Sequence, residues 1–101
     1  MPNFVKAAKK GDLGEGKGMV VDLEGNPIAL FNVGGSFYAI DNTCKHAEGP
    51  LGEGELDQAQ VTCPLHGWQY DVTTGACATD TSVSQKKYNV KVEGDDILIE
   101  I

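Results

Sequence analysis

Short β-branched and aromatic runs recur along the whole chain and are separated by turns that contain glycine. Three turns can be identified: residues 24–27, the pair Gly34-Gly35, and residues 93–96. Runs and turns at this spacing are typical of a small sandwich or barrel, and no segment favours a helix of more than two turns. The sequence therefore predicts an all-β fold.

The expected strands span residues 3–7, 18–23, 28–33, 37–41, 60–63, 69–72, 88–92 and 97–101. In the last two strands the same residue type returns at every second position: Val90 and Val92, then Ile97, Ile99 and Ile101. A period of two with one apolar face is typical of a half-buried antiparallel strand. We expect these two strands to form the last hairpin.

A length of 101 residues, 41% of them hydrophobic, allows one globular domain with a modest core. We therefore expect residues 1–101 to form a single domain. The net charge of −7 includes no arginine, so the chain lacks the positive surface that binds nucleic acid or an anionic membrane. This acidity serves solubility or steers the chain toward a basic protein partner, and the sequence leaves both open.

The N-terminus shows no basic region followed by an apolar run, which a signal peptide would require. The longest apolar stretches, such as residues 28–31, are far too short to span a bilayer. We therefore expect a cytoplasmic protein that does not enter a membrane.

The strand pattern lapses between residues 42 and 62, in a segment rich in glycine and acidic residues. Loops of this length inside a compact domain usually have a function. Cys44-x-His46 lies near its start, and Cys63-x2-His66 follows its end. These two pairs contain two of the three cysteines and both histidines of the chain, and thiolate and imidazole are ligands for borderline-soft metals.

Three interpretations of the two pairs compete. They could be unrelated buried residues, which two nearly identical pairs on loops make improbable. They could form a structural zinc site, although zinc modules usually place two cysteines together and two histidines together. They could hold an iron–sulfur centre in which one iron takes both cysteines and the other takes both histidines.

Cys44-x-His46 and Cys63-Pro64-Leu65-His66-Gly67 resemble the two ligand boxes of Rieske [2Fe–2S] proteins, and the similarity extends over nearly the whole chain. The resemblance implies a fold of three stacked antiparallel sheets. It also implies that Cys44 and Cys63 hold the inner iron and that His46 and His66 hold the outer iron near the surface.

Residues around the second box refine the resemblance. The stretch HGWQYD, residues 66–71, is similar to the second box of Rieske domains in ring-hydroxylating oxygenases. Tyr70 matches a family tyrosine whose hydroxyl donates toward a cysteine sulfur, and Trp68 replaces a serine that high-potential members carry. Cys77 is expected to be a small buried residue without a redox role.

Two features of the respiratory members are missing. The extra cysteines that form their disulfide are replaced here by Gly49 and Leu65, and residues 79–87, which match their proline-rich third loop, contain no proline.

The implied function is that of a Rieske-type ferredoxin, a one-electron carrier from a ferredoxin reductase to a terminal oxygenase. Both histidines are committed to the cluster and no glycine-rich phosphate motif is present, so we expect no catalysis by the chain alone. We expect a monomer. The alternatives are a Rieske-like small subunit of a larger enzyme, such as assimilatory nitrite reductase, and an iron–sulfur sensor.

Overall fold

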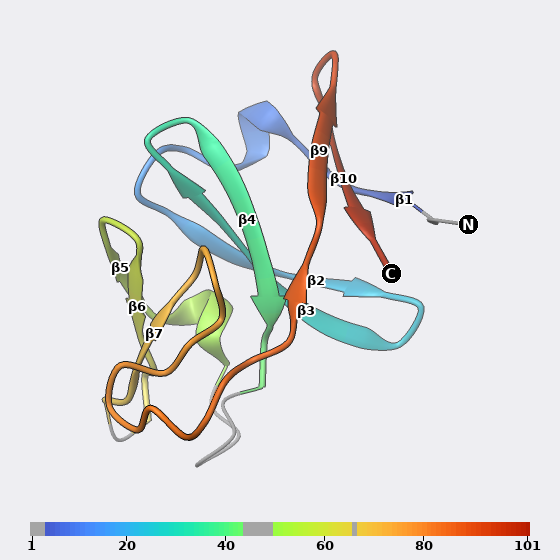
Figure 1. The fold of residues 1–101 in the computed structure, drawn as a ribbon. Coiled ribbons are helices and arrows are strands. Elements are labelled where there is room, and N and C mark those ends of the chain that lie inside the picture. The colour runs from blue at the N-terminus through green and yellow to red at the C-terminus, as the bar shows by residue number, and fades with distance from the viewer. Residues whose placement is uncertain (1–3, 44–49, 66) are drawn as a thin grey trace.

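The computed structural model of the protein describes residues 4–43, 50–65 and 67–101. Within these residues ten strands lie in three antiparallel sheets, and the two helices are single 3-10 turns (Figure 1). Neither of these helices has the length or the apolar character that crossing a membrane requires. The expected all-β fold of three antiparallel sheets is confirmed.

The first sheet has the order β1-β10-β9, the second β2-β3-β4-β8 and the third β5-β6-β7. The bounds of the strands are β1 Phe4–Lys9, β2 Gly18–Leu23, β3 Asn26–Val33, β4 Ser36–Asp41, β5 Glu55–Asp57, β6 Gln60–Thr62, β7 Gln69–Asp71, β8 Lys87–Tyr88, β9 Val90–Glu93 and β10 Asp96–Glu100. The two 3-10 helices are η1 Lys10–Asp12 and η2 Leu51–Glu53.

Strand β3 lies between two hydrophobic cores. Ile28 and Leu30 pack into a core shared with the first sheet, whereas Ala29 and Phe31 pack into a core shared with the third sheet. Successive side chains of a strand point to opposite faces, so a strand buried on both faces becomes a continuous apolar run. This arrangement explains the run at residues 28–31 and makes the second sheet the middle layer.

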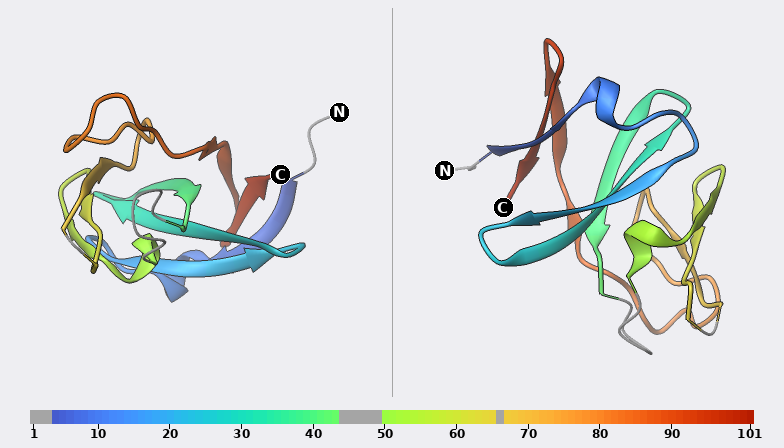
Figure 2. Two further views of the ribbon diagram at one scale, coloured as in Figure 1. Left: turned by 90° about the horizontal axis from the view of Figure 1, so that it is seen from below. Right: turned by 180° about the vertical axis from the view of Figure 1, so that it is seen from behind.

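The two outer sheets pack on opposite faces of the second sheet, and Figure 2 shows them at opposite ends of the molecule. The β9–β10 hairpin and β1 are at one end, and β5, β6 and β7 are at the other. The chain that follows β7 returns past the end of β4 before it reaches β8 and β9 (Figure 1). The elements that flank the expected ligand boxes lie at this second end, because η2, which follows the first box, packs into one core with β6 and β7, which flank the second. We call it the ligand-bearing end.

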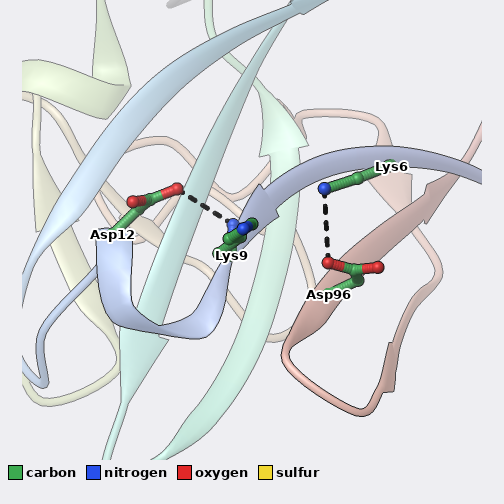
Figure 3. Close-up of polar contacts among 4 residues, drawn as sticks. All are labelled: Lys6, Lys9, Asp12 and Asp96. Carbon is green, nitrogen blue, oxygen red and sulfur yellow. Dashed lines mark hydrogen bonds and ion pairs between the residues drawn. The ribbon is translucent and has the colours of Figure 1, made fainter.

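The corner between β1 and η1 is held by local polar contacts (Figure 3). The Lys9 backbone N–H donates to Asp12 Oδ2 at 3.0 Å. Lys6 Nζ lies 3.4 Å from Asp96 Oδ1 on the neighbouring β10, with both side chains about half exposed. A pair this exposed contributes at most about 1 kcal/mol, so β1 depends mainly on backbone pairing and on the burial of Ala8.

Most expected strands agree with the structure to within two residues, but two differences concern the ligand-bearing end. The segment 42–62, where the strand pattern was expected to lapse, contains η2 and the edge strand β5 ahead of the expected β6, and β5 pairs with β6 from Glu55↔Thr62 to Asp57↔Gln60. The expected strand 88–92 is two strands in different sheets, because the chain leaves β8 beside β4 and joins β10 as β9. The last hairpin therefore consists of β9 and β10 only.

The turns follow the expected glycines. Gly34 and Gly35 have φ of 59° and 93°, which is the left-handed backbone that two-residue hairpin turns require. The first turn is shorter than expected, because Glu24 and Gly25 form it alone and Asn26 pairs with Leu23 at the start of β3. Val92, expected on a buried face, is 41% exposed because β9 is the edge of its sheet.

Candidate metal centre

Cys63 is the one expected ligand among the described residues; Cys44, His46 and His66 lie outside them, as do Lys45, Glu48 and Gly49. Cys63 directly follows β6, and only 2% of its surface is exposed. Its side chain belongs to the core between the second and third sheets. Among the residues that the structure describes, no three His, Cys, Asp or Glu side chains are grouped to hold a metal ion.

The second ligand box is a tight connection between two paired strands. β6 and β7 pair as far as Thr62↔Gln69, and the Cys63 N–H then donates to the Trp68 carbonyl at 2.7 Å. Gly67 has a φ of 73°, and its N–H donates to the Leu65 carbonyl at 2.7 Å. The box therefore buries Cys63 at its base and exposes Leu65, which is 46% accessible, at its tip.

The base of the first ligand box is closed by the buried Asn42. The Asn42 carbonyl accepts from the Leu51 N–H, and its side-chain Oδ1 accepts from the Gly52 N–H, each at 2.8 Å. Thr43 and Pro50 form an antiparallel bridge one step further out. The chain therefore enters and leaves the first box at one point, next to the end of β4.

A buried glutamine connects the third loop to the first box. Gln85 Nε2 donates to the carbonyl of Asp41 at 3.0 Å and to the carbonyl of Thr43 at 2.6 Å. The sequence offered no reason to single out this residue, because the two carbonyls lie more than forty positions earlier in the chain. The weak signal in the sequence was a polar residue placed between Val83 and the lysine pair Lys86-Lys87.

The third loop has a defined conformation although it lacks proline. The Asp80 carboxylate accepts from the Ser82 N–H at 3.0 Å and from the Ser82 hydroxyl at 2.6 Å. These hydrogen bonds lower the pKa of Asp80 from its usual 3.8. The Asp80 carbonyl also accepts from the Val83 N–H, so residues 80–83 form a turn.

The aromatic residues near the second box share a core with Cys63. Tyr70 is fully buried, and Trp68 packs against the same core from a half-buried position. Cys77 is buried as expected, is a free thiol, and its Sγ accepts from the Asp80 N–H at 3.3 Å. Donation by Tyr70 toward a cysteine sulfur stays a prediction.

Charge is unevenly distributed over the molecule. Residues 50–85 contain no lysine and five acidic residues, Glu53, Glu55, Asp57, Asp71 and Asp80. The ligand-bearing end is therefore the more acidic end.

Tyr88, which lies outside this segment, has a shifted pKa. Its hydroxyl donates to Asp41 Oδ1 at 2.6 Å, and burial together with this hydrogen bond raises the pKa of Tyr88 to about 12.

Comparisons with known proteins agree with this architecture. A model of the Rieske [2Fe–2S] domain matches residues 3–99. The ferredoxin component of biphenyl 2,3-dioxygenase from Rhodococcus jostii is 39% identical over 97% of this chain and 92% of its own length. The ferredoxin subunit of 3-phenylpropionate/cinnamic acid dioxygenase from Shigella boydii is 41% identical over 98% and 94%.

Solved structures give the same result. The ferredoxin of carbazole 1,9a-dioxygenase from Nocardioides aromaticivorans superimposes with a TM-score of 0.90 at 34% identity, covering 96% of both chains. A complex of reduced oxygenase and oxidized ferredoxin in carbazole 1,9a-dioxygenase contains a chain that matches with a TM-score of 0.89 at 31% identity, covering 96% of this chain and 92% of that one. A nitrite reductase small subunit from Mycobacterium tuberculosis has a TM-score of 0.92 at 23% identity, covering 100% and 96%, which shows the shared fold alone.

Proposed function

This chain belongs to the Rieske [2Fe–2S] domain family, and on that premise we propose that Cys44, His46, Cys63 and His66 ligate its cluster. It is a Rieske ferredoxin, an electron-transfer protein and not a catalyst by itself. The observation that carries this conclusion is the extent of the similarity, which spans nearly all of this chain and nearly all of its ferredoxin relatives.

The donor set fits such a cluster. Cys63 offers a buried thiol at the base of one box, and hydrogen bonds close the base of the other box at Asn42. The cluster, when bound, supplies a site that stores one electron. Cys44 and Cys63 would hold one iron and His46 and His66 the other, so each box contributes one thiolate and one imidazole.

The protein would accept electrons from a ferredoxin reductase and deliver them to a terminal oxygenase of the ring-hydroxylating class. Two relatives are components of aromatic dioxygenases, and a similar ferredoxin occurs in a complex with its oxygenase. The five acidic residues of the segment 50–85 support docking to basic partner surfaces.

The chain would act as a single domain over residues 1–101 and as a monomer in the cytoplasm. Two cores that share the middle sheet support one folding unit. The large apolar side chains exposed among the described residues, Val20, Leu65 and Val92, lie on different elements and form no common patch. The free thiol of Cys77 fits a reducing compartment. Sedimentation of the holoprotein and cell fractionation test these two points.

Rapid mixing tests the function. The protein is reduced, mixed with the oxidised ring-hydroxylating oxygenase encoded nearest to it, and followed by absorbance. We expect its oxidation to match reduction of the oxygenase, whereas Cys63→Ala protein, which lacks a cluster ligand, transfers nothing. An intact, reduced protein that no such oxygenase reoxidises would contradict the proposal.

A further inference from the structure

Gln85 is buried at the point where the third loop meets the first ligand box. The residue is 3% exposed, and both hydrogens of its amide are used on the carbonyls of Asp41 and Thr43. Thr43 is the last residue before Cys44, so the shorter of the two hydrogen bonds, at 2.6 Å, acts directly next to a proposed ligand. Asp41 has two further hydrogen bonds, because its carboxylate accepts from the Tyr88 hydroxyl and its N–H donates to the Lys86 carbonyl.

The amide has an energetic cost that an apolar side chain would avoid. Because both partners are carbonyl oxygens, the nitrogen must face them, and Oε1 then remains buried without a hydrogen-bond partner among the described residues. A buried acceptor without a partner is destabilising, and a methionine would fill similar space without that cost. The two donated hydrogen bonds are what the glutamine provides and methionine does not.

The backbone of Gln85 is attached to the chain that leaves the second box. Its N–H donates to the Gly75 carbonyl, and the Gly75 N–H donates to the carbonyl of Asp71, the last residue of β7, each at 2.7 Å. Gly75 has a φ of 84°, and a side chain there would clash with the Gln85 carbonyl. Gln85 is therefore linked by its backbone to the end of β7, the strand that follows the second box, and by its side chain to the chain that enters the first box.

We propose that Gln85 is a positioning residue that sets the placement of the first ligand box relative to the second, an inference that rests on the proposed ligand set. A cluster bound by both boxes needs the two segments at a fixed relative position, and among the described residues the Gln85 hydrogen bonds to Asp41 and Thr43 link the third loop to the chain that enters the first box. Removal of the amide would leave Thr43, and the ligand that follows it, free to shift relative to the second box.

The test compares holoprotein variants. Gln85→Met removes both hydrogen bonds at nearly constant volume, and Gln85→Asn is the milder variant that reaches at most one carbonyl. Asn32→Leu is the matched control, because Asn32 is also a buried amide that donates to a backbone carbonyl, that of Leu13, at 2.9 Å. Asn32 pairs with Phe37 at the opposite end of β4 from Asp41.

Four quantities are measured: iron release to a chelator, the electron paramagnetic resonance line shape, the midpoint potential and the melting temperature. We expect Gln85→Met to release iron several-fold faster, to broaden the resonance and to shift the potential, with Gln85→Asn intermediate. Asn32→Leu should lower the melting temperature and leave the resonance and the potential unchanged. If Gln85→Met does not fold, Gln85→Asn alone must show the resonance change.

Two results would overturn the proposal, and they have different consequences for the proposed ligands. Wild-type resonance and potential in both Gln85 variants, with a lower melting temperature, would make Gln85 a structural residue only and leave the proposed ligands intact. A wild-type protein without a Rieske signal would overturn the ligand set and the positioning role together.

Discussion

Tyr70 occupies the same buried core as Cys63, the one proposed ligand among the described residues. If its hydroxyl donates toward a cysteine sulfur, Tyr70→Phe removes a donor that stabilises the added electron. A net hydrogen bond of about 1 kcal/mol corresponds to roughly 40 mV for one electron, so we expect the midpoint potential to fall by roughly that amount. The control is Tyr38→Phe, which removes a hydroxyl from the rim of the same core. If Tyr70→Phe and Tyr38→Phe have the same midpoint potential, Tyr70 does not donate toward the cluster.

The ligand set makes a second prediction at the scale of single residues. Replacing any one of Cys44, His46, Cys63 and His66 by alanine should abolish the native cluster, because each proposed ligand would supply one of four terminal bonds. Iron and acid-labile sulfide analysis measures the result. Cys77→Ser is the control, since a serine hydroxyl can also accept from the Asp80 N–H and Cys77 is not one of the four proposed ligands. Loss of the cluster in Cys77→Ser would mean that a ligand has been misassigned.

Sequence and structure differ in what they show about individual residues. The proposed ligands could be named from the sequence because each box is a local pattern whose spacing is visible there, and their role stays a prediction. Gln85 could not, because its role depends on burial and on carbonyls of Asp41 and Thr43 that folding brings to it. A glutamine is common on surfaces, so its type alone carries no signal.

At the scale of elements, Gly75 joins the turn after β7 to the third loop. A side chain there must adopt a left-handed backbone and also clash with the Gln85 carbonyl. We expect Gly75→Ala to lower the free energy of unfolding by about 2–4 kcal/mol, as the sum of left-handed strain and overpacking. Gly25→Ala is the control, because Gly25 has nearly the same φ, 83°, and open space around it, and should cost only about 1–2 kcal/mol. Urea unfolding measures the free energy of unfolding of both variants. Equal losses of stability would contradict a contribution from the clash with the Gln85 carbonyl.

Strands could be predicted from the sequence where a whole apolar run stays within one sheet. β2 has the expected bounds, and the hairpin at Gly34 and Gly35 follows from its glycines. β5 was missed because its two charged residues, Glu55 and Asp57, mask a short edge strand. The separation of β8 from β9 at Asn89 was missed because local sequence pattern does not show that a chain changes sheets.

At the scale of the whole molecule, the acidic ligand-bearing end should speed association with a basic oxygenase surface. Glu53→Lys reverses an exposed charge on η2, next to the closed base of the first box. We expect roughly two- to five-fold slower association at low salt, equivalent to about 0.5–1 kcal/mol, with a weaker salt dependence. Asp95→Lys makes the same charge change in the distant β9–β10 turn and should have little effect. Faster association of Glu53→Lys would indicate an acidic partner instead.

The redox titration of the holoprotein, followed by electron paramagnetic resonance, tests the central claim most directly. Two neutral imidazoles in place of two thiolates raise the potential of such a cluster from about −400 mV to between about −150 and +300 mV. Trp68 replaces the hydroxyl donor of high-potential members, Gly49 and Leu65 replace their disulfide, and the net charge of −7 opposes reduction. We therefore predict a Rieske-type signal with a midpoint near −150 mV. A midpoint near −400 mV would contradict histidine ligation, and one above about +100 mV would contradict a low-potential carrier for an oxygenase.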